Sequence, residues 1–347
     1  MSAALRFGWL ALMAACSGSC SSPGSQPEGG ATTPPSWQVV LHDMTPTFLC
    51  VWGTAADDVF AVGGPLSDGT PTAALHYDGK IWTDLHPSGT TTFWWTNGVS
   101  SKDVWMVGEQ GRMTHWDGSR LTESTPLTAA TLYGVWAGAS NDVWAVGGIP
   151  EGGTAKPNDV LLHYDGHAWS AVPVPQPLGR TFFKVWGTAS DNLYVVGELG
   201  TIWHRKGTTW SLEANSPPLA TGNLTSVFGC SATEVYAVGG EDVLVSDGKT
   251  WTRANVSLEN GVNGVSCASP GKPVIVGFGG LKQRLVDGHW QSDFSSEPHS
   301  DLHGAWADPS GGFWAAGGAF VNDPMQGASR AGVIGYYGSS NIGSTVQ

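Results

Sequence analysis

A glycine that closes a short apolar segment recurs seven times along this chain. The seven positions are Gly63, Gly108, Gly147, Gly197, Gly239, Gly277 and Gly317, separated by 45, 39, 50, 42, 38 and 40 residues. Around each glycine, four short apolar segments follow one another with polar turns between them, beginning with a phrase such as Val51-Trp52-Gly53. A repeat of about 40 residues with four short strands is typical of a β-propeller. The spacing therefore predicts an all-β chain with seven blades.

The turns inside each repeat carry their own signals. In the first repeat we expect strands over residues 48–52, 59–63, 73–77 and 81–84. Asp78-Gly79 separates the last two, because an Asp-Gly pair tolerates the positive φ angles of a tight hairpin. An acidic residue precedes the second strand of several repeats and is expected to cap the turn through its own backbone. These acidic residues are Asp58, Asp103, Asp142 and Glu234.

The last repeat lacks its outermost strand, and the missing piece is expected at the other end of the chain. Ile334 to Gly338 supplies a third strand and its turn, but no tryptophan-led strand follows. Ser36-Trp37-Gln38-Val39-Val40 has that form. We therefore expect residues 37–41 to complete blade 7 and close the ring without an open edge. The propeller is expected over residues 37–340, followed by a disordered tail over 341–347.

The repeated phrase Val-Trp-Gly, Asp-Val-Trp-Ala-Val-Gly-Gly and His-Tyr-Asp-Gly-x-x-Trp resembles that of predicted propeller lipoproteins common in myxobacteria and their relatives. The resemblance covers about residues 37–340. The chain is also similar, less specifically, to kelch repeats, which blade 3 shows best with Gly147-Gly148 and Trp169. Propellers host many functions, so neither resemblance implies one activity.

The N-terminus has the pattern of a bacterial lipoprotein signal. Residues 1–15 contain Arg6 and then an apolar run too short to span a bilayer, and Met13-Ala14-Ala15-Cys16 resembles a lipobox. We expect a signal peptide over 1–15, a lipid such as palmitate on Cys16, and a flexible Ser/Gly/Pro tether over 16–36. These features predict a lipid-anchored protein of the cell envelope, on the outer membrane. Ordinary secretion with cleavage near Ala15 is the alternative.

Charge and cysteine content narrow the possible partners. Only 13% of residues are charged, the net charge is −13, and no Lys/Arg cluster exists that could follow a phosphate backbone, so no nucleic acid is expected as a partner. Cys230 and Cys267 occupy nearly equivalent places in consecutive repeats. The repeat positions allow a disulfide between them, but the favoured prediction is that they are two small buried apolar side chains. No Cys-x-x-Cys pair suggests zinc.

Four histidines share one repeat position, at the end of the third strand of blades 1 to 4: His76, His115, His163 and His204. Equivalent residues of a ring of blades lie far apart, so these side chains cannot meet at one metal ion. We expect structural histidines whose ring nitrogens bond to loop backbone, and no metal site.

The positions that vary most lie near the start of each innermost strand. These side chains are expected to ring the mouth of the central channel and to form a ligand-binding site, on a face that also carries the long loops. The predicted site residues are Leu49, Trp94, Trp95, Tyr133, Phe183, Lys184, Thr225, Asn263 and His303. Plugging of the channel without any ligand is the alternative.

The sequence favours a surface-anchored binding or scaffolding module that recognises a protein, peptide or glycan and acts as a monomer. No phosphate loop, nucleophile elbow or zinc motif appears, and no catalytic residue or cofactor is expected. Two alternatives remain open: an enzyme, either a glycan hydrolase or lyase or a galactose-oxidase-like redox protein using Tyr133, His303 and Cys50, and a structural subunit of an envelope complex.

Overall fold

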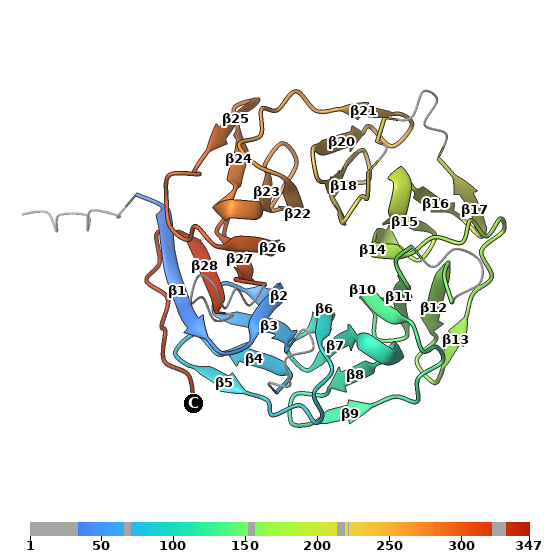
Figure 1. Ribbon diagram of the computed structural model, residues 1–347, viewed down its shortest axis with the longest axis horizontal. Helices are drawn as coiled ribbons and strands as arrows, with labels where there is room; N and C mark the ends of the chain where they lie inside the picture. The colour runs from blue at the N-terminus through green and yellow to red at the C-terminus, as the bar shows by residue number, and fades with distance from the viewer. Residues whose placement is uncertain (1–33, 66–70, 152–156, 214–218, 221, 321–330) are drawn as a thin grey trace, which may run out of the picture. The chain divides into compact units, whose positions relative to one another are not determined.

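Seven four-stranded antiparallel sheets are arranged in a ring in the computed structural model (Figure 1). The structure describes residues 34–65, 71–151, 157–213, 219–220, 222–320 and 331–347, so the signal peptide, Cys16 and most of the tether lie outside the described residues. The prediction of a seven-bladed β-propeller is confirmed. In every blade the strands follow one another from the innermost to the outermost, except at the closure of the ring.

The blades are built from the following strands. Blades 1 to 4 comprise β2 (Thr47–Ala55), β3 (Asp58–Gly64), β4 (Ala73–Tyr77) and β5 (Trp82–Asp84); β6 (Phe93–Ser100), β7 (Asp103–Gly108), β8 (Met113–Trp116) and β9 (Leu121–Glu123); β10 (Thr131–Ala139), β11 (Asp142–Gly148), β12 (Val160–Tyr164) and β13 (Trp169–Ala171); β14 (Phe182–Ala189), β15 (Asn192–Gly197), β16 (Ile202–Lys206) and β17 (Thr209–Leu212). Blades 5 to 7 comprise β18 (Ser226–Ser231), β19 (Glu234–Gly239), β20 (Asp242–Ser246) and β21 (Trp251–Arg253); β22 (Val262–Cys267), β23 (Pro273–Gly277), β24 (Lys282–Val286) and β25 (His289–Ser292); β26 (Asp301–Ala307), β27 (Phe313–Gly318), β28 (Gly332–Gly338) and β1 (Ser36–Met44). Short 3₁₀ turns follow the second strand in blades 2, 4 and 6: η1 (Glu109–Gly111), η3 (Glu198–Gly200) and η4 (Phe278–Gly280).

The recurring glycine has a steric cause that is the same in all seven blades. A Cβ at Gly63 would lie 1.9 Å from the carbonyl oxygen of Thr47, at the start of the innermost strand. At the other six positions a Cβ would lie 1.9 to 2.2 Å from the corresponding carbonyl oxygen. No side chain fits at such a distance, so the glycine lets the second strand end close against the first.

The N-terminal strand closes the ring as predicted. β1 pairs antiparallel with β28, with Trp37 opposite Tyr337, and forms the outer edge of the last blade (Figure 1). The Trp37 indole donates a hydrogen bond to Asp293 Oδ2 at 3.0 Å, which ties the closing strand to blade 6. The N-terminal strand and the three C-terminal strands therefore form one sheet. This shared sheet closes the ring between blades 1 and 7.

The C-terminal residues 341–347 are not a disordered tail, which corrects the prediction. The Trp82 backbone N–H donates to the Thr345 carbonyl at 2.8 Å, and the Gln347 N–H donates to the Trp82 carbonyl at 2.8 Å. The Trp82 indole also donates to the Gly343 carbonyl at 3.1 Å. The end of the chain thus extends blade 1 beyond β5, because β5 offers free backbone groups at the edge of its sheet.

Aromatic residues of one blade pack on small residues of the next. A Cβ at Gly229 of blade 5 would lie 2.0 Å from the Trp186 ring of blade 4, and one at Gly53 of blade 1 would lie 3.0 Å from the Trp306 ring of blade 7. The apolar core accordingly crosses the blade boundaries, and one cluster joins residues of blades 3, 4 and 5. Large buried rings contribute several kcal/mol to each such interface, on the order of 25 cal/mol per Å² buried.

Candidate functional site

The predicted mouth residues are produced by a repeated β-bulge. In blade 1, Phe48 pairs with Gly63 and Cys50 pairs with Val62, so Leu49 is an extra residue without a partner on the second strand. The same shift occurs at the start of the innermost strand in five further blades. The extra residues there are Trp94, Tyr133, Phe183, Asn263 and His303. A bulge redirects a side chain out of the regular alternation. In these blades the redirected residue is the one just before the regular pairing of the innermost strand begins.

Four of these side chains form a continuous row of rings, here called the aromatic arc: Phe183, Tyr133, Trp94 and His303. The ring centroids of Phe183 and Tyr133 lie 5.4 Å apart, those of Tyr133 and Trp94 4.8 Å, and those of Trp94 and His303 5.8 Å. All three pairs are edge-to-face, a favoured geometry for aromatic rings. Each ring is partly exposed. The arc therefore brings together side chains from blades 4, 3, 2 and 7.

His303 is held in one tautomer. Its Nδ1 lies 2.7 Å from the Leu49 carbonyl oxygen, which can only accept, so Nδ1 carries the proton. Burial, with a smaller effect from Lys184, lowers the pKa of His303 to about 3. Burial also raises the pKa of Tyr133. The arc is thus uncharged at neutral pH.

The remaining predicted mouth residues do not join the arc as an outward surface. Leu49 is 1% exposed and Asn263 is 8% exposed. Thr225 precedes β18 and donates its hydroxyl to the Asn263 carbonyl at 2.9 Å, which links blades 5 and 6. These three residues therefore pack behind the channel mouth, and the side chains exposed there belong to the aromatic arc.

Lys184 lies beneath the arc, which corrects its predicted place at the mouth. It is 3% exposed, its Nζ donates to the Tyr133 carbonyl at 2.8 Å, and the same atom lies 4.1 Å from the centroid of the Trp95 ring. Lys184 and Trp95 both line a small cavity of about 30 Å³ on the channel axis. Burial lowers the pKa of Lys184 to about 7. A partner at the surface therefore meets the rings rather than this ammonium group.

The strand histidines are structural, but their partners are carboxylates rather than loop backbone. His76 Nε2 lies 2.7 Å from Asp58 Oδ1, and the imidazole stacks on Phe60 with centroids 4.2 Å apart. His115 and His163 make the same contacts with Asp103 and Asp142, at 2.8 and 2.9 Å. The acidic residue and the aromatic residue two positions later lie on one face of the strand, and the histidine is opposite the aromatic residue. His204 uses other partners: its Nε2 pairs with Asn192 Oδ1 at 2.8 Å, and its Nδ1 pairs with the Glu213 carboxylate at 2.9 Å.

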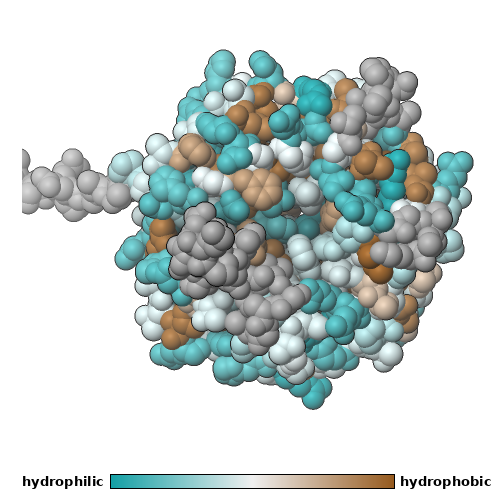
Figure 2. All heavy atoms as spheres, in the orientation of Figure 1, coloured by the Kyte–Doolittle hydropathy of each residue, from teal (hydrophilic) through white to brown (hydrophobic). Residues whose placement is uncertain are grey.

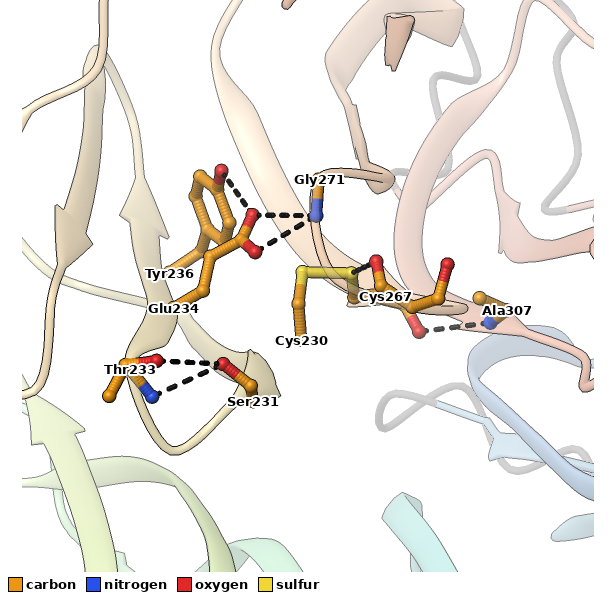
Figure 3. The surroundings of a disulfide bond; sticks show 10 residues. Cys230, Ser231, Thr233, Glu234, Tyr236, Cys267, Gly271 and Ala307 are labelled. Carbon is orange, nitrogen blue, oxygen red and sulfur yellow. Dashed lines mark hydrogen bonds between the residues drawn. A yellow bond between two sulfur atoms is a disulfide. The ribbon is translucent and has the colours of Figure 1, made fainter.

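Cys230 and Cys267 form a disulfide, so the favoured prediction of two unpaired side chains is wrong (Figure 3). The bond joins the ends of β18 and β22, the innermost strands of blades 5 and 6. The Cα atoms of the two cysteines lie 5.2 Å apart. Nearby, Glu234 accepts hydrogen bonds from the Gly271 N–H at 2.9 and 3.1 Å (Figure 3). Blades 5 and 6 are therefore joined by a covalent bond and by a carboxylate.

Two features bear on other kinds of site. Among the described residues, no three His, Cys, Asp or Glu side chains are placed to hold a metal ion. Within the same part of the chain, no helix has the length and apolar character needed to cross a bilayer.

Tyr133 and His303 both contact Trp94, whereas the Cys50 thiol is buried and lies 3.5 Å from the Thr96 carbonyl oxygen that accepts from it.

A second hollow lies away from the axis. A groove of about 490 Å³ separates blades 2 and 3 and is lined by the rings of Trp105, Tyr164 and Trp169. Asp117 and Arg120, which form an ion pair at 3.3 Å, stand on its rim. In the view along the ring axis, the surface is also hollowed near the centre, and apolar residues are scattered over this face (Figure 2).

The fold and these sites define the chain as a seven-bladed β-propeller, and solved structures of that fold are similar to it. A streptogramin B lyase has a TM-score of 0.68 and 11% identity, with 88% of this chain and 99% of that chain covered. YCF48 bound to a D1 peptide has a TM-score of 0.64 and 15% identity, with the same coverage of 88% and 99%. A virginiamycin B lyase from Staphylococcus aureus has a TM-score of 0.65 and 11% identity, covering 86% and 99%. At these identities the likeness concerns the fold alone.

No protein-family model and no curated protein sequence matches the chain. The resemblance to myxobacterial propeller lipoproteins and to kelch repeats is therefore not supported by a family match.

Proposed function

We propose that this protein is a binding propeller of the cell envelope that docks a partner protein or peptide on the aromatic arc. The arc itself carries the proposal: four rings from four blades contact one another and remain partly exposed. Large rings with few rotatable bonds lose little entropy when they bind, and they dominate the energetics of protein interfaces. Rings that their neighbours already hold in place lose even less conformational entropy on binding.

The size of the axial cavity favours a macromolecular partner over a small molecule. Pockets for small ligands usually enclose about 300 to 1,000 Å³. The cavity beneath the arc has about 30 Å³. A partner that covers the arc from outside fits this geometry better than a ligand buried in the channel. YCF48 has been solved with a D1 peptide, and that propeller is the precedent for a peptide as ligand.

The anchoring part of the proposal rests on the sequence. Cys16 follows small residues after a short apolar segment, and the Ser/Gly/Pro-rich tether leads from there to the propeller. We propose that a lipid on Cys16 holds the propeller at the outer membrane, with the tether leaving its ring faces accessible. Feeding labelled palmitate to producing cells tests this, since the wild type should be labelled and Cys16→Ser should not. A Cys16→Ser variant that stays labelled and membrane-bound would overturn it.

Co-purification with cross-linking from the native envelope tests the arc. Trp94→Ala and Phe183→Ala should each reduce recovery of the partner at least tenfold, which corresponds to a loss of about 1.4 kcal/mol or more. Trp210→Ala, on the outer strand β17 of blade 4, is the matched control and should leave recovery unchanged. Retained recovery with both arc variants would refute the arc as the docking site.

The groove between blades 2 and 3 supports a second candidate, a glycan. Aromatic faces beside a carboxylate and a guanidinium, here Trp169, Asp117 and Arg120, are the groups that pack on a sugar ring and bond to its hydroxyls. A glycan array probed with wild type and Trp169→Ala separates the two candidates. Binding lost in Trp169→Ala and kept in Trp94→Ala would assign the glycan to the groove.

A further inference from the structure

The cavity on the channel axis is lined by residues of all seven blades. Residues of every innermost strand line it, from Cys50 of β2 to Trp306 of β26, and most of them are apolar. Its volume of about 30 Å³ is enough for one or two water molecules or one monatomic ion. None of the four rings of the aromatic arc lines this cavity.

Among the described residues that line this cavity, Lys184 is the one lysine or arginine, and none is an aspartate or glutamate. An ammonium group has three N–H donors. In the described part of the chain, its one hydrogen bond goes to the Tyr133 carbonyl, and its other close neighbour is the face of Trp95. A buried cation without a counter-charge is costly, because the interior replaces hydration only where partners are present.

The titratable groups that face Lys184 do not supply the missing charge. Burial raises the pKa of the Cys50 thiol to about 12 and lowers the pKa of His303 to about 3, so both are neutral at pH 7. Burial also raises the pKa of Tyr133, whose hydroxyl is therefore neutral as well. Among the side chains that the structure describes, the protonated lysine consequently has no anionic partner.

A second donor lines the same cavity. Asn97 Oδ1 accepts a hydrogen bond from the Ala137 N–H at 2.8 Å, so the group that this side chain can still offer is its Nδ2 donor. Lys282, the other lysine that is buried in the described part of the chain, is arranged differently. Lys282 donates to two carbonyls, of Gly280 at 2.6 Å and of Pro298 at 2.8 Å, and it does not line the cavity. The open donors at Lys184 are thus a property of this site that Lys282 does not share.

We propose that the axial cavity is a binding site for a single monatomic anion of the chloride class, held by Lys184 Nζ with Asn97 as a second donor. The volume excludes phosphate and sulfate with their hydrogen-bonding shells, and the positive lysine excludes metal cations. The apolar remainder of the wall suits a halide, which needs few donors and tolerates contact with indole rings. The inference is independent of the aromatic arc and of its partner.

Thermal unfolding at constant ionic strength tests the site, with chloride replaced stepwise by gluconate, which is too large to enter. The unfolding midpoint of the wild type should rise with the logarithm of chloride concentration, because a ligand of the native state stabilises it by RT ln(1 + [L]/Kd). Lys184→Met should show no such rise, and Lys282→Met should keep it. An anion that needs the protonated lysine, whose pKa is about 7, should require about tenfold more chloride at pH 8 than at pH 6 for half-saturation. A wild-type midpoint that does not depend on chloride at pH 6 would overturn the proposal.

Crystals of the wild type grown in sodium bromide give a test that does not depend on a variant folding. Bromide scatters anomalously, so the expected result is one anomalous peak on the ring axis within contact distance of Lys184 Nζ. Density at that position without an anomalous signal would identify a water molecule and refute the anion.

Discussion

The Cys230–Cys267 disulfide should stabilise the propeller by an amount that the loop it closes allows us to calculate. The bond spans 37 residues of sequence. In the chain-entropy model, closing a loop of that length lowers the entropy of the unfolded chain by about 13 cal/mol/K, or about 4 kcal/mol at 25 °C. For the unit from Pro34 to Gln347, an unfolding entropy of about 2.1 cal/mol/K per residue gives about 0.66 kcal/mol/K. The melting temperature should therefore fall by about 6 °C without the bond.

Differential scanning calorimetry of the wild type and of Cys230→Ala/Cys267→Ala, each with and without a phosphine reductant, measures this difference. The oxidised wild type should melt about 6 °C above the double variant. Reductant should lower the melting temperature of the wild type by about 6 °C and leave that of the double variant unchanged. The reductant comparison matters because Cys267 is 8% exposed, so its truncation also removes packing. Melting temperatures within about 1 °C in all four samples would refute the loop-entropy reasoning.

Three further predictions concern the closure of the ring, the C-terminus and the strand histidines. Trp37→Ala should lower the unfolding free energy in urea by about 2 to 3 kcal/mol, because a large ring and a tie to blade 6 are lost; an unchanged midpoint would contradict this role of the strand. Removing residues 341–347 should increase hydrogen exchange at the Trp82 amide at least tenfold, and equal protection would show that the tail is not docked. Burial alone would raise the pKa of Asp58, but its hydrogen bonds with His76 and Thr54 lower it overall, so its stabilising effect is present above the ordinary carboxyl pKa and is lost as the pH falls below about 4. Asp58→Asn should accordingly cost more stability at pH 6 than at pH 3, and an equal cost at both would contradict the ion pair.

The number of blades could be predicted because it depends on a local steric requirement repeated in the sequence. Wherever the second strand ends against the carbonyl that begins the first, as at Gly63 and Thr47, only glycine fits. The closing strand could be predicted for a related reason, since Trp37 leads a segment of the same form as the outer strands and blade 7 lacked one. Both inferences compare one part of the chain with another and need no knowledge of long-range contacts.

The partners of individual side chains could not be predicted in the same way. The repeat pattern predicts loop backbone as the partner of the strand histidines, yet Asp58 and His76 meet because the register of β3 and β4 places them on one face. The cysteine pairing depended on the distance between the inner strands of two blades, and repeat alignment alone left it undecided. The end of the chain contained no strand pattern, and it pairs because β5 leaves an edge open.

The sequence by itself determined the architecture, because glycine spacing and repeat comparison are local properties of the chain. It also marked the variable positions at the start of the innermost strands as candidate residues of the channel mouth. Tertiary structure alone decided what those residues do. The bulges at the start of the inner strands align Tyr133 and Trp94 in one row of rings, while Lys184, one residue after Phe183, turns into the axial cavity. The bulge at Phe183 breaks the regular alternation of side chains along the strand, and which of the two neighbouring side chains faces the cavity depends on how the other six blades surround the axis.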